Sequence, residues 1–410
     1  MSRQFEAVVV GAGLAGACAA ALLVRHARIA PHRVALLCQE LPASPSSDAP
    51  PQLRVAAISR ASERVLHAAR AWQRLDASRL CPYERMRVWH ESALPFGAAA
   101  LCFDAADVGE PNLGHIAEIS ALQRACIDSF CEAGGELIED TLERLGFGRE
   151  LARLECVNRV LEARVVIGAD GAHSAVRAGA GLAVRSHDYR QRAIVATVAT
   201  ERPHAYTAWQ RFLSTGPLAF LPLFDGCCSI VWSLDLAVAQ ELGDCDARLF
   251  EQRLDAASAQ ALGATRLVSE RASFPLRSVA ADSYVAARCA LIGDAAHVIH
   301  PLAGQGANLG LLDAAALCEA IAAAPAQQED PGALRLLRRY EQQRRTHNLA
   351  MDAAMSLFQR GFAAARGPAA WLINGGLTAV NRSHALKRVF ARQALGLAGE
   401  LPRMARATAA

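Results

Sequence analysis

The N-terminal segment carries the pattern that most limits how this chain can fold. Apolar residues predict a buried strand over Phe5–Val10, and an alanine-rich stretch predicts a helix over Ala17–His26. Between them lies a G-x-G-x-x-G turn, Gly11–Gly16, and a second strand is predicted over Arg33–Leu37. The three glycines allow, in order, a tight turn, close approach of a pyrophosphate, and packing of helix on strand. The pattern therefore predicts a dinucleotide-binding fold with phosphate at the helix N-terminus.

The position that usually holds the ribose of the dinucleotide departs from this pattern. The fingerprint expects an acidic residue at the end of the second strand, where this chain has Cys38. Glu40 reaches the ribose if the end of the strand is shifted or bulged. The alternative is that Glu40 is a solvated loop residue and that the ribose is held less firmly. The sequence leaves both interpretations open.

The composition is that of a globular protein. Of the 410 residues, 52% are hydrophobic and the net charge is +3, whereas disordered chains combine low hydrophobicity with a large net charge. The length suggests about two to three domains. The near balance of 43 basic and 40 acidic residues produces no overall field that would attract nucleic acid, so we expect no nucleic-acid partner.

Two further features bear on cellular location and on metals. The 12 cysteines include no CxxC pair and no Cys/His cluster at zinc spacing, so we expect free thiols in a reducing cytoplasm and no metal site. The run Ala7–Val24 has no charged residue and is near the lower length limit of a membrane span. Its glycines, and Glu6 just before it, favour the dinucleotide fold over a span or a signal peptide.

Two later segments repeat the change from an apolar strand to a glycine-containing polar loop. The strand predicted over Arg164–Gly168 runs into the loop Ala169–Arg177, and the strand predicted over Cys289–Ile292 runs into the loop Gly293–Asn308. An acid beside glycine at a strand end suits hydrogen bonding to a polyol, and a glycine-rich loop that opens a helix offers N–H groups to an anion. Taken singly, either loop is also compatible with an ordinary aspartate-capped turn.

The order of the three motifs, GxGxxG, GADGxxSxVR and GDAAHxxxPxxGQGxN, resembles that of the para-hydroxybenzoate hydroxylase-like flavoproteins. The segments Pro50–Ser62, Asn112–Ile116, Gly216–Leu223 and His300–Gly306 are similar, more narrowly, to the ubiquinone-biosynthesis hydroxylase family. The resemblance extends to Ala394–Leu397. It implies an α/β fold in which a Rossmann-like FAD-binding domain carries an inserted antiparallel β-sheet substrate domain and a C-terminal helical segment.

Changes in residue pattern place the expected boundaries of these parts. The FAD-binding domain is expected over residues 1–184 and 274–345, the substrate-domain sheet over 185–273, and the helical segment over 346–410. In the sheet segment, short β-branched and aromatic runs alternate with Gly, Pro and Asp turns, as antiparallel strands do. The helical segment is rich in Ala, Leu and Arg, with a break near Gly367 and Pro368.

The resemblance implies FAD contacts at positions that match the motifs of the family. Asp294 would hydrogen-bond the ribityl chain, Asp170 with Gly171 would line the pyrophosphate region, and Arg54 would lie near the flavin. The loop before Asn308 would place backbone N–H groups at the pyrimidine edge of the flavin, where negative charge develops on reduction. The full expected set is Gly11, Gly13, Gly16, Glu40, Arg54, Gln123, Asp170, Gly171, Gly293, Asp294, Gly304, Gln305, Gly306, Ala307 and Asn308.

Hydroxylation of an aromatic ring by O2 needs an electron source and an oxygen activator, which side chains alone do not supply. The resemblance implies that FAD provides both, with NADH or NADPH as the electron donor and a flavin C4a-hydroperoxide as the oxygen donor. Pro301 would flank the reacting face of the flavin, and His300 is a candidate for activating the phenol. For His297 we expect a helix residue satisfied by nearby backbone rather than an acid or base.

The expected substrate is a polyprenylated phenol or quinol of ubiquinone biosynthesis. Trp209, Phe220 and Trp232 are candidates for lining its pocket, although aromatic residues in strands also favour core positions. Some segments are similar to relatives that act on 2-polyprenylphenol and others to demethoxyubiquinol hydroxylases, so the ring position stays open. Two other readings remain: a related flavoenzyme with another aromatic or prenyl substrate, and a non-catalytic scaffold whose Cys38 weakens FAD binding.

The C-terminal tail is locally basic. The segment from Asn381 to Ala410 contains six basic residues and one acidic residue, Glu400, with apolar residues between them. This pattern suits an anionic membrane surface, and a packed helix with a solvated face is the alternative. The family acts on a lipid and works with other ubiquinone-biosynthesis proteins. We therefore expect a cytoplasmic protein with peripheral contact at the inner face of the membrane.

Overall fold

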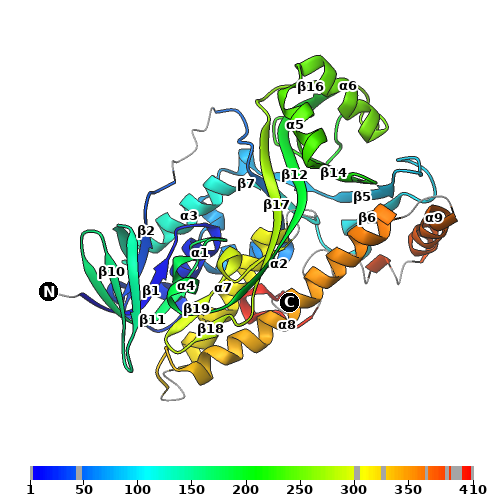
Figure 1. Ribbon diagram of the computed structural model, residues 1–410. Helices are drawn as coiled ribbons and strands as arrows, with labels where there is room; N and C mark the ends of the chain where they lie inside the picture. The colour runs from blue at the N-terminus through cyan, green and yellow to red at the C-terminus, as the bar shows by residue number, and fades with distance from the viewer. Residues whose placement is uncertain are drawn as a thin grey trace.

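Two large β-sheets, a small third sheet and the helices packed on them make up the structure, a computed structural model (Figure 1). It describes residues 3–42, 49–299, 305–324, 329–364, 368–383, 387–388 and 399–407. The mixture of a parallel sheet, an antiparallel sheet and a long C-terminal helix confirms the expected α/β fold class.

The first sheet has five parallel strands, and four of them form its centre. β1 (Arg3–Val10) pairs with β2 (Val34–Cys38) on one side and with β11 (Val160–Gly168) on the other, and β19 (Cys289–Leu291) pairs with β11. Strands covered on both faces read as continuous apolar runs, which is why the sequence located these four. The other members are β8 (Glu136–Glu139), β9 (Leu142–Phe147), β10 (Ala152–Cys156) and β18 (Val285–Ala286), and the main path runs β18-β19-β11-β1-β2-β8.

Three helices surround the glycine turn of the first sheet. α1 (Leu14–His26) packs against both α3 (Ile119–Glu132) and α7 (Gln305–Ala323). The uncharged run Ala7–Val24 thus forms the second half of β1 and most of the largely buried α1. By length and composition α7 could cross a membrane, but 67% of its apolar window is buried inside the fold. Such burial is what a core helix of a globular domain shows.

The second sheet has nine strands and is mostly antiparallel. Its order is β20-β17-β12-β15-β14-β13-β5-β6, and β16 is attached to β12. The strands predicted from Ala193 to Leu234 are confirmed as parts of β12, β13, β14 and β15. The bounds are β5 (Arg85–His90), β6 (Leu101–Asp104), β12 (Val184–Thr200), β13 (Thr207–Leu213), β14 (Gly216–Pro222), β15 (Cys228–Asp235), β16 (Thr265–Leu267), β17 (Ala272–Ala281) and β20 (His297–Val298).

The sheets do not follow the expected segment boundaries. β5 and β6 lie within residues 1–184, yet they are strands of the second sheet because β5 pairs in parallel with β13. β17 begins at Ala272 and β20 at His297, so the same sheet also draws on the segment 274–345. The helical segment expected from residue 346 starts in the middle of α8 (Leu334–Ala364), so the helix begins before the expected boundary. Pairing between strands distant in sequence causes these differences.

Helices cover the two faces of the second sheet differently. α5 (Leu236–Asp244) packs on β12 and β15, and α6 (Ala247–Ser258) lies beside β16. α8 contacts β13 and β14, while α9 (Pro368–Arg382) lies along β6. Figure 1 shows α5 and α6 on one side of the sheet and α7 and α8 on the other.

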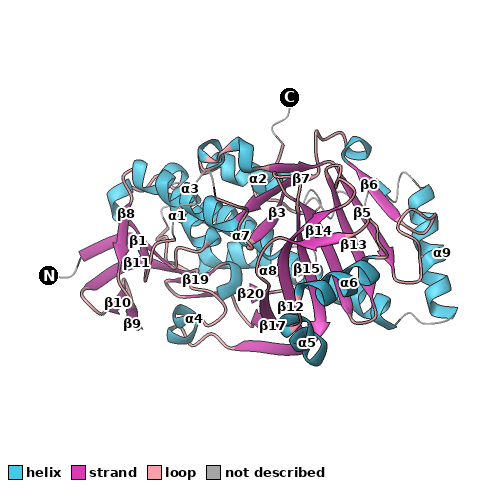
Figure 2. Cartoon of the chain, turned by 90° about the horizontal axis from the view of Figure 1, so that it is seen from above, coloured by secondary structure: helices cyan, strands magenta, loops and turns pink. Residues whose placement is uncertain are grey.

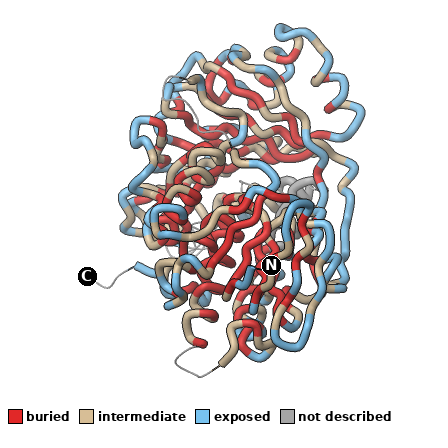
Figure 3. Tube along the Cα trace, turned by 90° about the vertical axis from the view of Figure 1, so that its left-hand side faces the viewer, coloured by how far each residue is buried: buried red, intermediate tan, exposed pale blue. Residues whose placement is uncertain are grey.

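A small sheet joins the two large ones. It consists of β3 (Val55–Ser59), β7 (Gly114–Glu118) and β4 (Cys81–Tyr83), in the order β3-β7-β4. Figure 2 places it between the first and second sheets, and Figure 3 shows that buried residues run through the strands of both layers. The remaining short elements are α2 (Arg60–Ala68), α4 (Ala175–Gly179), η1 (Pro31–Arg33), η2 (Trp72–Arg74), η3 (Ala77–Arg79), η4 (Ala105–Val108), η5 (Gly293–Ala295) and η8 (Arg403–Ala405).

Candidate FAD site and its surroundings

The three sequence motifs meet at one edge of the first sheet. Because β1, β11 and β19 are parallel neighbours, their carboxyl ends lie side by side. Backbone hydrogen bonds continue the pairing past the strand ends: Ala169 N donates to Val10 O at 2.8 Å, and Ile292 N donates to Gly168 O at 2.9 Å. Open parallel sheets bind ligands beyond the carboxyl ends of their strands. Loops far apart in the chain therefore form one site.

The glycine turn has the shape that a pyrophosphate needs. Gly11 has φ +105°, and a Cβ on Gly16 would stand 2.0 Å from Gly11 O, so both positions require glycine. A Cβ on Gly13 would meet only Ala169 O, at 3.9 Å. Gly13 precedes α1 with no side-chain cap, so the first N–H groups of α1 are free to bind an anion. The open side of Gly13 is where phosphate oxygens fit.

The carboxylate of Asp294 stands in a recess of the protein. Its side chain is exposed on one side, but the surrounding protein atoms limit its hydration and so raise its pKa. The charges of His297 and Arg54 lower this pKa, but their effect is smaller. Within the described residues no group forms a hydrogen bond with it. An exposed but poorly solvated carboxylate is suited to accept hydrogen bonds from a polyol such as the ribityl chain. The expected roles of Asp294 and Arg54 fit this placement.

The first turn of α7 supplies a second set of N–H groups. Gln305, Gly306, Ala307 and Asn308 open this helix, and the first N–H groups of a helix lack intrahelical partners. The side chain of Asn308 is already used: its Oδ1 accepts from Ser59 N at 2.9 Å, and its Nδ2 donates to Ala57 O at 2.8 Å. Asn308 thereby ties α7 to β3. The expected residues His300, Pro301 and Gly304 lie outside the described residues.

The second motif uses its acid to shape the loop. Asp170 accepts hydrogen bonds from Ser174 Oγ and from Val176 N, the latter at 3.1 Å, at the start of α4. This is the aspartate-capped turn that the sequence left open, and Gly171 follows with φ +84°. Arg177, which sequence reasoning did not single out, donates to Ala172 O at 2.7 Å and to Ala295 O at 2.8 Å. It joins the second motif loop to the third.

The ribose end of the site contains one buried thiol and one exposed acid. Cys38 ends β2 inside the core, where burial, with a contribution from Glu139, raises the pKa of its thiol to about 11. Cys38 is therefore a neutral, apolar residue. Glu40 follows in an exposed bend, and no described residue pairs with it. Gln123 is half-buried on α3. Of Cys38 and Glu40, only Glu40 is free to meet a ribose hydroxyl.

A buried polar cluster lies behind the third motif. Oδ2 of Asp313 is 2.5 Å from Nε2 of His297 and 3.2 Å from Gly293 N, while its Oδ1 accepts from Arg344 Nε at 2.8 Å and from Asn348 Nδ2 at 3.2 Å. The expectation for His297 is wrong, because it lies in β20 and its partner is a carboxylate. Sequence reasoning missed Asp313 because it lies inside an apolar helical run.

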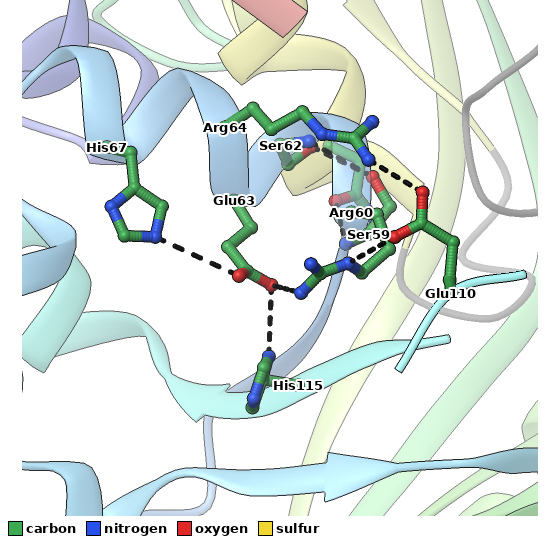
Figure 4. Close-up of polar contacts among 9 residues, drawn as sticks. Ser59, Arg60, Ser62, Glu63, Arg64, His67, Glu110 and His115 are labelled. Atoms are coloured by element: carbon green, nitrogen blue, oxygen red, sulfur yellow. Dashed lines mark hydrogen bonds and ion pairs between the residues drawn. The ribbon is translucent and has the colours of Figure 1, made fainter. Parts of the chain in front are cut away.

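A second charged network fixes α2 beside the small sheet (Figure 4). Glu63 accepts from Arg60 Nη1 at 2.6 Å and lies 3.1 Å from His115 Nδ1 on β7. Burial raises the pKa of Glu63, but these two partners bring it below its ordinary value. The carboxylate of Glu110 accepts hydrogen bonds from Arg60 Nε at 3.1 Å and from Arg64 Nη2 at 2.6 Å. The network anchors the helix that directly follows β3, and so supports the strand to which Asn308 is bonded.

The three aromatic candidates for the substrate pocket lie in the core instead. Trp209, Phe220 and Trp232 belong to one buried cluster with Phe250 and Leu254 of α6. Strand residues alternate between faces, and these three all point to the face that α5 and α6 cover. In the structure they are core residues, as the alternative reading proposed.

Metal ligands and disulfides do not contribute to the site. In the described ranges, no group of three or more His, Cys, Asp or Glu residues could hold a metal ion. All 12 cysteines are free, and eight of them are buried, Cys38 among them. The thiols therefore act as small apolar residues, as free cysteines in cores do.

Comparisons with known proteins agree with this site. Residues 151–354 match the family described as FAD binding domain. The chain is 35% identical over 408 residues to 3-demethoxyubiquinol 3-hydroxylase of Escherichia coli (strain K12), covering 97% of this chain and 100% of that protein. It is 32% identical over 430 residues to ubiquinone biosynthesis monooxygenase COQ6, mitochondrial, of Xenopus tropicalis, covering 92% of this chain and 90% of that protein.

Solved structures show the same fold. Against p-nitrophenol 4-monooxygenase PnpA from Pseudomonas putida DLL-E4 the TM-score is 0.75, at 19% identity, with 96% of this chain and 99% of that chain covered. This likeness concerns the fold alone. Together with the motif loops at the parallel sheet edge, the full-length similarity shows that the chain belongs to the ubiquinone-biosynthesis family of FAD-dependent hydroxylases, within the para-hydroxybenzoate hydroxylase-like flavin monooxygenases.

Proposed function

We propose that this protein hydroxylates the ring of a polyprenylated phenol or quinol in ubiquinone biosynthesis, with O2 as the oxygen source and NADH or NADPH as the electron donor. One O2 and one NAD(P)H then yield one hydroxyl group on the ring and one water. The observation that carries this proposal is the meeting of three FAD-type loops at the edge of β1, β11 and β19, beneath a broad antiparallel sheet.

Bound FAD supplies electron transfer from the nicotinamide and the activation of oxygen. The residues of the chain bind and orient it. The N–H groups of α1 after Gly13 face the pyrophosphate, Asp294 accepts from the ribityl chain, and the first turn of α7 offers N–H groups and a helix dipole to negative charge on the ring system. The second sheet excludes water from the space above, where a substrate ring would lie.

Purified protein provides the first test. We expect visible flavin absorbance, or its appearance after added FAD, and oxidation of NAD(P)H that a prenylated phenol stimulates. In a deletion strain we expect an under-hydroxylated prenylated intermediate to accumulate, and its structure identifies the ring position. Absence of flavin binding even at excess FAD, or a normal quinone pool in the deletion strain, would exclude the proposal.

We also propose that the protein is cytoplasmic and touches the inner face of the membrane peripherally. Leu94 and Phe96 form an apolar tip beside α9, with 74% and 58% of their surfaces exposed. Asn374 on α9 donates to Ser92 Oγ at 2.9 Å, so this tip and α9 form one surface. Of the basic tail, Lys387 pairs with Asp107 at 3.2 Å, and residues 389–398 lie outside the described ranges.

Sedimentation with phosphatidylcholine vesicles, with and without phosphatidylglycerol, tests the membrane contact. We expect binding that the double variant Leu94→Ser/Phe96→Ser reduces several-fold. Val157, which is also 58% exposed but lies after β10 in the first sheet, provides the matched control Val157→Ser. Equal binding by the double variant and the control would contradict the proposal.

A further inference from the structure

The second sheet has an outer face and an inner face with different surroundings. On the outer face, Ile230 and Trp232 of β15 pack with Phe250 of α6. On the opposite face, Leu221 of β14 and Phe212 of β13 pack with residues of the small sheet. Strand β3 of this small sheet is hydrogen-bonded to Asn308 of the candidate FAD site. We call this second side, which also faces α8, the inner face. Any substrate held between this sheet and FAD lies against the inner face.

Strand register identifies which side chains share the middle of the inner face. Val195 pairs with Val231, Val231 with Ala219, Ala219 with Gln210, and Gln210 with Val88. Directly paired residues project to the same side of a sheet. These five residues therefore form a row across β12, β15, β14, β13 and β5, which we call the central row.

One end of the central row is partly open. Val195 and Val231 are partly exposed although they lie on strands paired on both sides, whereas Ala219, Gln210 and Val88 are buried. The outer-face neighbours of the two valines, Ile194 and Trp232, are buried under the helices. The exposure of the two valines is thus on the inner side. An apolar surface that is partly exposed on the side of a sheet turned toward a cofactor site is of the kind that lines small-molecule sites.

Gln210 is the one polar side chain in the central row. Its exposed fraction is only 5%, and no side-chain hydrogen bond joins its amide to another residue in the described part of the chain. A buried amide left without partners costs free energy. Because an amide offers donors and an acceptor together, Gln210 suits a ring that carries a hydroxyl group beside a second oxygen or another hydroxyl.

The central row and its neighbours also lack charge. The row before it contains Thr197, Ser229 and Leu221, and the row after it contains Ala193 and Ser233. None of these side chains carries a charge. These rows of the sheet therefore offer no arginine to pair with an aromatic carboxylate. The inner face is therefore built for a neutral ring.

We propose that Gln210 hydrogen-bonds the ring oxygen of a neutral phenol or quinol and thereby sets both the orientation of the ring and the preference for uncharged substrates. This inference rests on the proposed function, since it concerns the same site. It adds the residue that recognises the ring and the charge class of the substrate.

Titration of the FAD-loaded protein with defined probes tests the inference through the visible flavin spectrum. The probes are 2-prenylphenol, its methyl ether, and 4-hydroxy-3-prenylbenzoate, which differs by a carboxylate. We expect the wild type to bind 2-prenylphenol at least about tenfold more tightly than the carboxylate. Gln210→Leu should weaken binding of 2-prenylphenol by about tenfold and that of the methyl ether by less, because the ether offers no hydroxyl proton.

Two controls separate recognition from folding. Gln210→Met removes the same amide while keeping a long unbranched side chain, and should reproduce the effect of Gln210→Leu with normal FAD content. Leu213→Met is a volume-conserving change on the opposite face of β13 and should leave all three affinities unchanged. Wild-type affinity for 2-prenylphenol in both Gln210 variants, or equal wild-type binding of the carboxylate and the phenol, would overturn the inference while leaving the proposed function standing. A wild-type holoprotein that neither binds nor hydroxylates 2-prenylphenol would overturn both.

Discussion

His297 and Asp313 meet inside the core with 2.5 Å between Nε2 and Oδ2, and this contact joins the third FAD loop to α7. Arg344 of α8 reaches the other oxygen of the same carboxylate at 2.8 Å. Asp313 and Arg344 are both completely buried. The loop that presents Asp294 is therefore held from behind by a carboxylate that also fixes two helices.

Replacing Asp313 by Asn should destabilise the protein strongly. The variant leaves Arg344 buried without a countercharge, and breaking a buried pair from one side costs about 3–5 kcal/mol. Urea unfolding measures the loss. The double variant Asp313→Leu/Arg344→Met, which removes both charges, should be less destabilised than Asp313→Asn alone. A single variant as stable as the wild type would show that the pair contributes little.

The same carboxylate should make stability depend on pH in the acid range. Burial raises the pKa of Asp313, but His297 and Arg344 outweigh it and hold the pKa well below its ordinary 3.8. A depressed folded-state pKa stabilises the protein above the unfolded pKa, and this stabilisation disappears as pH falls toward the folded value. Unfolding free energies from pH 6 to pH 3 should therefore fall more steeply for the wild type than for Asp313→Asn. Parallel curves would contradict the assignment.

Two neighbouring glycines should respond differently to the same substitution. Gly16→Ala places a Cβ 2.0 Å from Gly11 O, so we expect loss of stability and of folded yield. Gly13→Ala meets only Ala169 O at 3.9 Å, so the protein without FAD should keep its unfolding free energy to within about 1 kcal/mol. Its added methyl group points into the space assigned to pyrophosphate, and FAD affinity should fall. Unchanged FAD affinity in Gly13→Ala would place the pyrophosphate elsewhere.

Removing the carboxylate of Asp294 should separate stability from cofactor binding. Burial raises its pKa, so ionisation above the unfolded pKa costs the folded protein free energy. Asp294→Ala should therefore lower FAD occupancy sharply without lowering the melting temperature of the protein freed of FAD. Flavin absorbance per protein and thermal unfolding are the two measurements. Full FAD retention with normal activity would contradict the ribityl assignment.

The ribose contact can be located by comparing two exposed acids. Glu40→Ala should weaken FAD binding by about tenfold, the effect of losing a hydrogen bond to a charged group. Glu139 pairs in register with Cys38 on the adjacent strand and is also exposed, so Glu139→Ala is the matched control and should leave the dissociation constant unchanged. If neither variant binds FAD more weakly, the ribose is held by another group.

Much of the FAD site was readable from the sequence because its signals are local. The glycines at 11, 13 and 16, the acid at 170 and the acid at 294 each directly follow an apolar strand, and parallel strands bring their carboxyl ends to one edge. Local order along the chain therefore implied a common site. The capping role of Asp170 and the availability of Glu40 depended on contacts that the same patterns left open.

What the sequence by itself determined was the parallel sheet with its three loops and the strand pattern of the second sheet. Only the tertiary structure decided which face of that sheet is covered by α5 and α6 and which is turned toward the candidate FAD loops, because a period of two defines two faces without assigning their neighbours. Trp209 and Gln210 are adjacent in the chain, yet Trp209 packs under α6 and Gln210 lies on the opposite face, in register with Ala219 and Val88. The partners of Asp313 were likewise set by packing, since α7, α8 and β20 are separate elements that meet in the folded core.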